Sequence, residues 1–268
     1  MRQGRVVHGG RLQGCTPSSQ GKVRLADGRI VAEQDVQWLA PFEPRTIFTL
    51  ALNYADHAAE LASKSSKDQA TFLQAQHSEP VVFLKAANAV VGHRGLTRRP
   101  HDAEFMHYEC ELAVVIGRQG CRVRREDALQ YVHGYTVAND YAIRNFLEPY
   151  YRPNLRVKNR DGATALGPWL VPTAEIPDPR QLRLTTHVNG KLVQEGTTAD
   201  MIHDVPSLIE YISGIMTISP GDVILTGTPK GSVDVRPGDE VVCEVEGVGS
   251  LVNTLIADWV PAERLGHS

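Results

Sequence analysis

The most constraining feature of this sequence is a succession of short, strand-like segments that do not alternate regularly with helices. Segments such as VILTGTP and DEVVCEVEGVGSLVNTLI are rich in β-branched residues and are interrupted by glycine and proline, as strands and turns are. A Rossmann fold or a TIM barrel would need strands that alternate with helices. We therefore expect a mixed, β-rich α+β fold, a β-barrel or roll with short peripheral helices.

Three local patterns predict individual elements. Asp27-Gly28 and Asn189-Gly190 each lie between alternating segments, and such dipeptides favour two-residue hairpin turns. Near the middle of the second half, apolar residues recur at helical spacing and predict an amphipathic helix. Its expected buried stripe consists of Val205, Leu208, Ile209, Ile212, Ile215 and Met216.

Proline punctuation divides the chain into two unequal parts. The segment APFEPRTIF carries two prolines and has the composition of a linker. We predict a small N-terminal β segment at residues 1–42 and one large domain at residues 43–268. The polar stretch 63–79 is typical of a mobile loop or of a lid that closes over a site.

Composition and charge argue against several classes of function. The net charge is −3 over 268 residues, which does not indicate a nucleic acid or an anionic membrane surface as a partner. No run approaches the roughly 20 apolar residues of a membrane span, and the N-terminus lacks the apolar centre of a signal peptide. The sequence has no GxGxxG or GxxxxGK[ST] motif, so a nucleotide site is unsupported. The four cysteines form no CxxC pair and no zinc-type spacing, so we expect reduced thiols in a cytoplasmic protein. They are Cys15, Cys110, Cys121 and Cys243.

Two glutamates in the strand-like segment MHYECELAVVIGR raise a chemical problem. Side chains alternate along a strand, so His107, Glu109 and Glu111 share one face. Carboxylates two residues apart lie about 7 Å from each other at Cα and repel unless one is protonated or a cation is shared. For the pair alone, a solvated strand face is the more common arrangement. The apolar run LAVVIG that follows indicates burial instead, and a hard divalent cation would then suit the pair.

Asp140 is the expected third carboxylate of this site. It ends the strand-like segment GYTVAND. Three carboxylates around one cation leave coordination positions for water and substrate, so such a site would be open and catalytic.

Four separated motifs resemble the fumarylacetoacetate hydrolase superfamily, in the order in which that family has them. They are HYECELAVVIGR, GYTVANDYAIRNF, RPNLRVKNRDG and GDVILTGTPKG, and the likeness extends over roughly residues 45–258. Within the superfamily, the chain is most similar to the branch that acts in homoprotocatechuate (4-hydroxyphenylacetate) catabolism. The bifunctional form in that branch has two tandem halves, and this chain resembles the C-terminal half. The resemblance therefore implies a fumarylacetoacetate hydrolase-like catalytic domain in a stand-alone subunit that forms a homodimer.

The resemblance also implies roles for individual residues. Glu109, Glu111 and Asp140 would bind Mg²⁺ or Mn²⁺. His57 and Glu60, in NYADHAAE, would form an acid–base dyad, since residues three apart on a helix are neighbours. The alternative for this pair is a weak surface contact.

Lys158 and Arg144 are the cationic candidates. Lys158, in RVKNRDG, matches the active-site lysine of the family, and its ammonium could stabilise an enolate or a carboxylate. Arg144, expected one helical turn after Asp140, could hold a substrate carboxylate. The alternatives are an exposed lysine and, for the arginine, an ion pair with Asp140 or Glu148.

Gly227 and Thr228 lie on a glycine-rich turn that could contact the substrate, or that could be a plain β-turn. His107 shares the carboxylate face but lies outside the expected ligand set. Weaker candidates are Lys85, Tyr150 and Tyr151.

The implied activity is that of a divalent-metal-dependent decarboxylase and/or isomerase. Its substrate would be a 2-oxo (2-hydroxy-diene) di- or tricarboxylic acid, a small molecule, which reacts through a metal-bound enolate. The alternative is a hydrolase that cleaves the C–C bond of an acylpyruvate such as fumarylpyruvate, with His57 as the general base toward water. The presence of His57, Glu60 and Lys158 together argues against a third class, a non-catalytic metal-binding protein.

Overall fold

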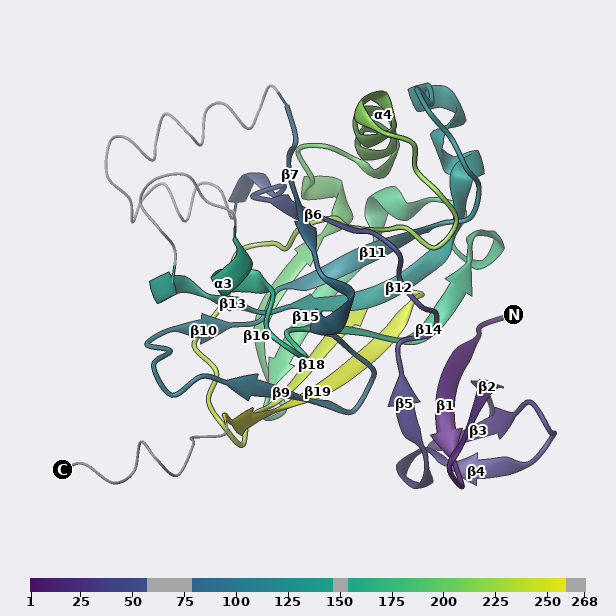
Figure 1. Cartoon of the computed structure of the whole chain (residues 1–268), viewed down its shortest axis with the longest axis vertical. Coiled ribbons are helices and arrows are strands. Elements are labelled where there is room, and N and C mark those ends of the chain that lie inside the picture. Colours follow the sequence, from purple (N-terminus) through teal and green to yellow (C-terminus); the bar gives the residue numbers. More distant parts are fainter. Residues whose placement is uncertain (57–78, 147–153, 259–268) are drawn as a thin grey trace.

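Strands dominate the computed structural model, which describes residues 1–56, 79–146 and 154–258. In these parts the strands form three large sheets and one two-stranded sheet (Figure 1). Helices are few and short within the described ranges, and the predicted β-rich α+β class is confirmed. The two-stranded sheet consists of β10 (Met106–His107) and β13 (Ala142–Ile143).

The first large sheet, purple in Figure 1, contains only N-terminal residues and has the strand order β4-β3-β2-β1-β5. The hairpin predicted at Asp27-Gly28 is present between β3 and β4. Gly28 has a φ of +89°, a conformation that glycine adopts without steric cost. Trp38 of this sheet packs edge-on against Trp169 with 5.1 Å between ring centroids. The strands are β1 (Gly4–His8), β2 (Arg11–Pro17), β3 (Lys22–Leu25), β4 (Ile30–Ala32) and β5 (Gln37–Leu39).

The second sheet has seven strands in the order β7-β6-β17-β11-β12-β14-β8. Its centre is the antiparallel pair β11 and β12, and β11 is buried along its whole length, as the run LAVVIG predicted. The strands are β6 (Ile47–Ala51), β7 (Val81–Lys85), β8 (Val90–Val91), β11 (Cys110–Ile116), β12 (Val132–Asp140), β14 (Thr164–Pro172) and β17 (Val223–Leu225).

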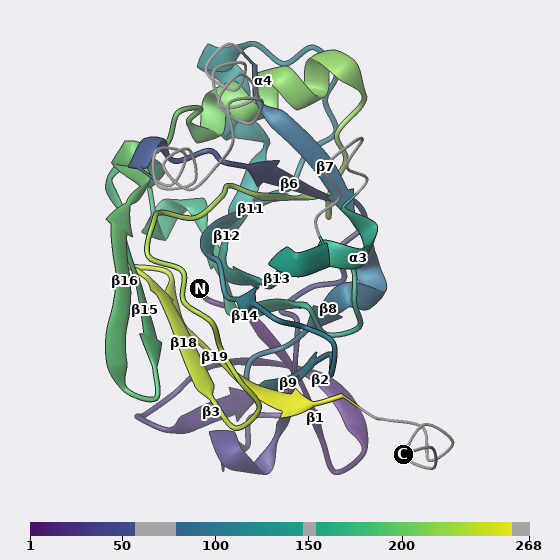
Figure 2. The same ribbon diagram turned by 90° about the vertical axis from the view of Figure 1, so that its left-hand side faces the viewer.

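The third sheet has the strand order β16-β15-β18-β19-β9 and packs against the seven-stranded sheet. Figure 2 shows the two sheets curving toward each other, and one large apolar core joins residues of both. The hairpin predicted at Asn189-Gly190 connects β15 and β16, and both residues have positive φ. The strands are β9 (Gly95–Arg99), β15 (Arg183–Val188), β16 (Lys191–Thr197), β18 (Glu240–Val245) and β19 (Gly249–Ala257).

The predicted amphipathic helix is α4 (Val205–Ile215), which begins where the Asp204 side chain accepts a hydrogen bond from the backbone N–H of Ser207. Its buried stripe is one turn shorter than predicted. Ile215 is 70% exposed and Met216 is 46% exposed, because the helix ends at Ile215 and the backbone of Met216 is extended.

The other helices of the described residues have seven residues or fewer. In the described residues no helix is both long enough and apolar enough to cross a membrane. These short helices are α3 (Leu155–Lys158) and the 3-10 helices Glu33–Asp35, Ala87–Ala89, Arg125–Tyr131, Arg144–Phe146, Thr173–Glu175, Pro179–Gln181 and Thr198–Asp200.

Candidate metal and active site

The central strand pair brings the three predicted carboxylates together. Because β11 and β12 are antiparallel, with Cys110 opposite Asn139, the start of one strand lies beside the end of the other. The backbone N–H of Asp140 donates to the carbonyl of Glu109 at 2.9 Å. Glu109, Glu111 and Asp140 are all buried and each offers a carboxylate oxygen within 4.8 Å of the others.

The strand around these glutamates is less regular than predicted. It was expected to run without a break through residues 106–118, whereas Tyr108 and Glu109 separate β10 from β11. The break arises because His107 pairs with Ala142 of β13, while the next strand pairs with β12. Glu109 therefore precedes β11, and its carboxylate still reaches the other two.

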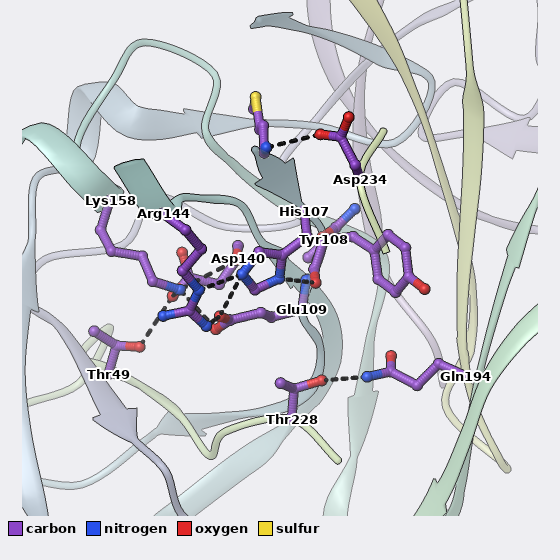
Figure 3. A network of polar contacts seen from close by, with 12 residues as sticks. Thr49, His107, Tyr108, Glu109, Asp140, Arg144, Lys158, Gln194, Thr228 and Asp234 are labelled. Atoms are coloured by element: carbon purple, nitrogen blue, oxygen red, sulfur yellow. Dashed lines mark hydrogen bonds and ion pairs between the residues drawn. The ribbon is translucent and has the colours of Figure 1, made fainter. Parts of the chain in front are cut away.

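Two buried lysines neutralise part of the charge. Lys158, the last residue of α3, donates from Nζ to Glu109 Oε2 at 2.6 Å and to Asp140 Oδ2 at 2.9 Å. Lys85, the last residue of β7, forms an ion pair with Asp140 Oδ1, and the Thr49 hydroxyl donates to Asp140 Oδ2 at 3.3 Å. Figure 3 shows Lys158 and Thr49 converging on Asp140. Buried charges of this kind are tolerated because each has a partner of opposite sign.

The pKa values of the two lysines are shifted in opposite directions. Burial lowers the pKa of Lys85, and the attraction of Asp140 only partly offsets this. Burial also acts to lower the pKa of Lys158, but the carboxylates of Asp140 and Glu109 outweigh it and raise that pKa above its ordinary value. Lys158 is therefore the more firmly protonated of the two cations.

Glu111 is the carboxylate whose interactions are incomplete. Its Oε2 accepts a hydrogen bond from the backbone N–H of Gly227 at 2.6 Å, whereas its buried Oε1 has no hydrogen-bond partner in the described part of the chain. Burial, then the negative charges of Asp140 and Glu109, raise the pKa of Glu111 well above its usual range. A cation would relieve both defects, and an all-carboxylate donor set fits a hard divalent ion.

Arg144 borders the cluster and is held by two groups. Its Nη2 donates to Glu109 Oε1 at 2.9 Å and its Nε donates to His107 Nε2. His107 Nδ1 lies 3.0 Å from the carbonyl oxygen of Tyr108, which assigns the proton to Nδ1 and leaves Nε2 as the acceptor. The Arg144 side chain is 25% exposed, so it can also meet a molecule from outside.

The expected helical turn between Asp140 and Arg144 was wrong. The chain instead continues through β13, and a 3-10 turn begins at Arg144. Its ion pair is with Glu109, where the sequence suggested Asp140 or Glu148; the latter lies outside the described residues.

The glycine-rich turn belongs to the same site and is more than a plain turn, because the Gly227 N–H bonds to Glu111. Gly227 has a φ of +91°, and a Cβ there would lie 3.0 Å from Asn53 Cβ. Thr228 is buried, and its Oγ1 accepts a hydrogen bond from Gln194 Nε2 at 3.1 Å.

Several predicted residues cannot be placed. His57 and Glu60 lie outside the described residues, as do Tyr150, Tyr151 and the possible lid up to residue 78. Conversely, sequence reasoning missed Thr49 and Gln194. A polar residue inside the apolar segment TIFTLA was the available signal for Thr49, and none marked Gln194.

Known proteins with similar sequences carry related activities in their names. The fumarylacetoacetate (FAA) hydrolase C-terminal family matches residues 46–256. A 4-hydroxyphenylacetate degradation bifunctional isomerase/decarboxylase from Salmonella dublin is 55% identical over 213 residues, which are 80% of this chain and 47% of the relative. The chain thus spans about half the length of such bifunctional relatives.

Solved structures agree with this relationship. The 5-carboxymethyl-2-hydroxymuconate delta-isomerase from Mycobacterium smegmatis is 33% identical with a TM-score of 0.80, covering 97% of this chain and 100% of that chain. Fumarylpyruvate hydrolase from Pseudomonas aeruginosa, in complex with Mn²⁺ and pyruvate, is 28% identical with a TM-score of 0.71, covering 82% and 91%. The resemblance seen in the sequence is confirmed: the chain belongs to the fumarylacetoacetate hydrolase family.

Proposed function

We propose that this protein is a divalent-metal-dependent isomerase and/or decarboxylase of a 2-oxo (2-hydroxy-diene) di- or tricarboxylic acid in homoprotocatechuate catabolism. The observation that carries the proposal is the buried cluster of Glu109, Glu111 and Asp140 beside Lys158. Its support is the similarity to relatives named isomerase/decarboxylase and to a 2-hydroxyhepta-2,4-diene-1,7-dioate isomerase from Mycobacterium marinum.

Glu109, Glu111 and Asp140 would hold Mg²⁺ or Mn²⁺, since both ions accept carboxylate oxygens. The chemistry that such an ion supplies when bound is Lewis-acid polarisation of the substrate carbonyl. The partnerless Oε1 of Glu111 supports this assignment.

Lys158 and Arg144 would bind and orient the anionic substrate. The Lys158 ammonium, fixed by two carboxylates, would supply positive charge that stabilises the negative charge developing on the carbonyl oxygen. Arg144 has Nε and Nη2 engaged by protein groups. The remaining N–H groups at its exposed end would hold a substrate carboxylate.

Proton movement would be assigned to His57, with Glu60 as its hydrogen-bond partner. In the isomerisation, the proton leaves the 2-hydroxyl oxygen and one is added at a carbon of the conjugated chain, so the composition is unchanged. In the decarboxylation, the bond to a carboxylate carbon breaks, CO₂ leaves, and its electron pair delocalises onto the conjugated carbonyl before a proton adds at carbon. One proton carrier near neutral pH suffices for both steps.

A substrate panel read by product mass tests the function. Loss of CO₂ identifies a decarboxylase, and an unchanged mass with a shifted ultraviolet band identifies an isomerase. The proposal fails if neither product forms. Full activity in EDTA would refute the requirement for a metal ion. Unchanged Mn²⁺ binding by a variant that combines Glu109→Ala with Asp140→Ala would refute the proposed metal ligands.

The similarity to fumarylpyruvate hydrolase gives hydrolysis of an acylpyruvate as the second candidate. The same residues would then serve a reaction in which His57 activates water. Two fragments whose masses sum to substrate plus water would establish it.

Cytoplasmic location and a homodimer complete the proposal. Light scattering coupled to size-exclusion chromatography measures the oligomeric state directly.

A further inference from the structure

A buried glutamine outside the carboxylate cluster has all of its hydrogen-bonding groups engaged. Gln194 of β16 is 3% exposed. Its Nε2 donates to Thr228 Oγ1 at 3.1 Å and to the carbonyl of Pro229 at 2.7 Å. Its Oε1 accepts from the Thr186 hydroxyl at 2.8 Å. Figure 3 shows the contact between Gln194 and Thr228.

These partners fix which way round the amide lies. The Pro229 carbonyl can only accept, so the amide nitrogen must face it. The opposite orientation would set two oxygens against each other at 2.7 Å and leave a buried N–H facing away from its acceptor. Gln194 Nε2 is therefore the donor toward Thr228, and Thr228 Oγ1 is the acceptor.

The backbone supports this arrangement. Gln194 lies directly opposite Thr186 in the β15–β16 pair, next to an irregularity in the strand register. A Cβ at Gly196 would lie 2.5 Å from Pro229 Cβ, so glycine at this position lets the turn approach the strand. The contact is built by both segments rather than by one flexible side chain.

The consequence concerns the hydroxyl proton of Thr228. One lone pair of its Oγ1 is engaged by Gln194, and the described residues supply no acceptor for its own O–H. Thr228 directly follows Gly227, whose N–H contacts Glu111. The proton is therefore available to an oxygen that enters the site.

We propose that Gln194 is a positioning residue that keeps Thr228 as a hydrogen-bond donor to a carboxylate oxygen of the substrate. This inference rests on the proposed function, because it needs an anionic substrate in the site. By fixing Thr228 as a donor, Gln194 makes the site prefer a substrate group that accepts a hydrogen bond. A threonine whose hydroxyl is free to rotate would show a weaker preference.

The experiment is a double-mutant cycle of Gln194→Glu and Thr228→Val. A carboxyl group at position 194, ionised or protonated, has fewer hydrogen-bond donors than an amide. The Thr228 hydroxyl then donates to this carboxyl group and is no longer available as a donor to the substrate. Each single change should raise KM for 2-hydroxyhepta-2,4-diene-1,7-dioate by about 10- to 100-fold, as expected for a hydrogen bond to a charged group. The double variant should be no worse than either one, with kcat changed much less than KM.

Thr198→Val is the matched control, because Thr198 is as buried as Thr228 and is bonded to Pro179 and Leu182. It should lower the thermal midpoint while leaving KM at the wild-type value. Gln194→Met serves as a second variant of similar length if the glutamate variant does not fold.

Three outcomes overturn the inference: wild-type KM in Thr228→Val, wild-type KM in Gln194→Glu, or single effects that multiply in the double variant. A wild-type protein that does not turn over the diene instead refutes the proposed function. Calorimetric binding of 2-oxoheptanedioate to the same four proteins then decides the role of Gln194 separately. Absence of binding refutes both.

Discussion

Replacing Glu111 by glutamine should stabilise the protein in EDTA, although it removes a proposed metal ligand. The wild-type carboxyl is buried and has a raised pKa. Above about pH 4.5, the unfolded chain releases this proton while the folded chain retains it, so wild-type stability falls as pH rises. Glutamine carries no such proton, and its oxygen can still accept from Gly227.

The size of the effect follows from linkage. Each pH unit between the unfolded and folded pKa values of Glu111 changes the free energy of unfolding by about 1.36 kcal/mol. While the folded chain keeps the Glu111 proton, the gap in free energy of unfolding between Glu111→Gln and wild type should widen by roughly 2.7 kcal/mol from pH 5 to pH 7. In a chain of this size, the difference in thermal midpoint between Glu111→Gln and wild type should therefore be larger at pH 7 than at pH 5 by about 5–11 °C.

Urea unfolding in EDTA at pH 5, 6 and 7 measures this gap. Adding Mn²⁺ at about 100 times its dissociation constant should then stabilise wild type by about 2.7 kcal/mol and the variant much less. A variant that is less stable than wild type in EDTA at pH 7, or that gains as much from Mn²⁺, would refute the reasoning.

Three further predictions concern positioning and stability. The amide of a glutamine lies near the Nε2 position of a histidine, whereas the amide of an asparagine lies near the Nδ1 position. His107→Gln should therefore keep the acceptor for Arg144, and His107→Asn should lose it and raise KM about tenfold or more. Equal KM values for the two variants would contradict this. Gly227→Ala should destabilise the protein more than Gly28→Ala in thermal unfolding, since both glycines have similar positive φ but only the former meets a neighbour within 4 Å. Asp204→Ala should cost about 0.5–2 kcal/mol in urea unfolding through loss of the cap of α4, with kcat and KM unchanged; a change in KM would indicate that the helix acts on the site.

Local chemistry explains why parts of the fold were predictable. Asp27-Gly28 and Asn189-Gly190 specify their hairpins through backbone conformations that few other residues adopt. The burial of Glu111 followed from the apolar run after it. Both inferences use neighbours in sequence, and both are confirmed.

The remaining features depend on which strands become neighbours in space. Lys85 reaches Asp140 because β7 pairs with β6, and Gln194 reaches Thr228 because the β15–β16 hairpin lies beside the glycine-rich turn. No periodicity encodes such contacts between distant segments. The apolar stripe of α4 was overestimated for a related reason, since spacing alone does not show where a helix ends. The His57–Glu60 dyad stays a prediction.

The pairing of acids with lysines has a consequence for how this protein matures. Lys85, Lys158 and Arg144 are paired with Asp140 and Glu109, and the raised pKa of Glu111 favours its neutral form. The charged groups of the pocket can therefore find partners within the polypeptide alone. Folding need not wait for an ion, and chelation followed by reloading should be reversible. Such a protein can fold first and bind its metal ion later.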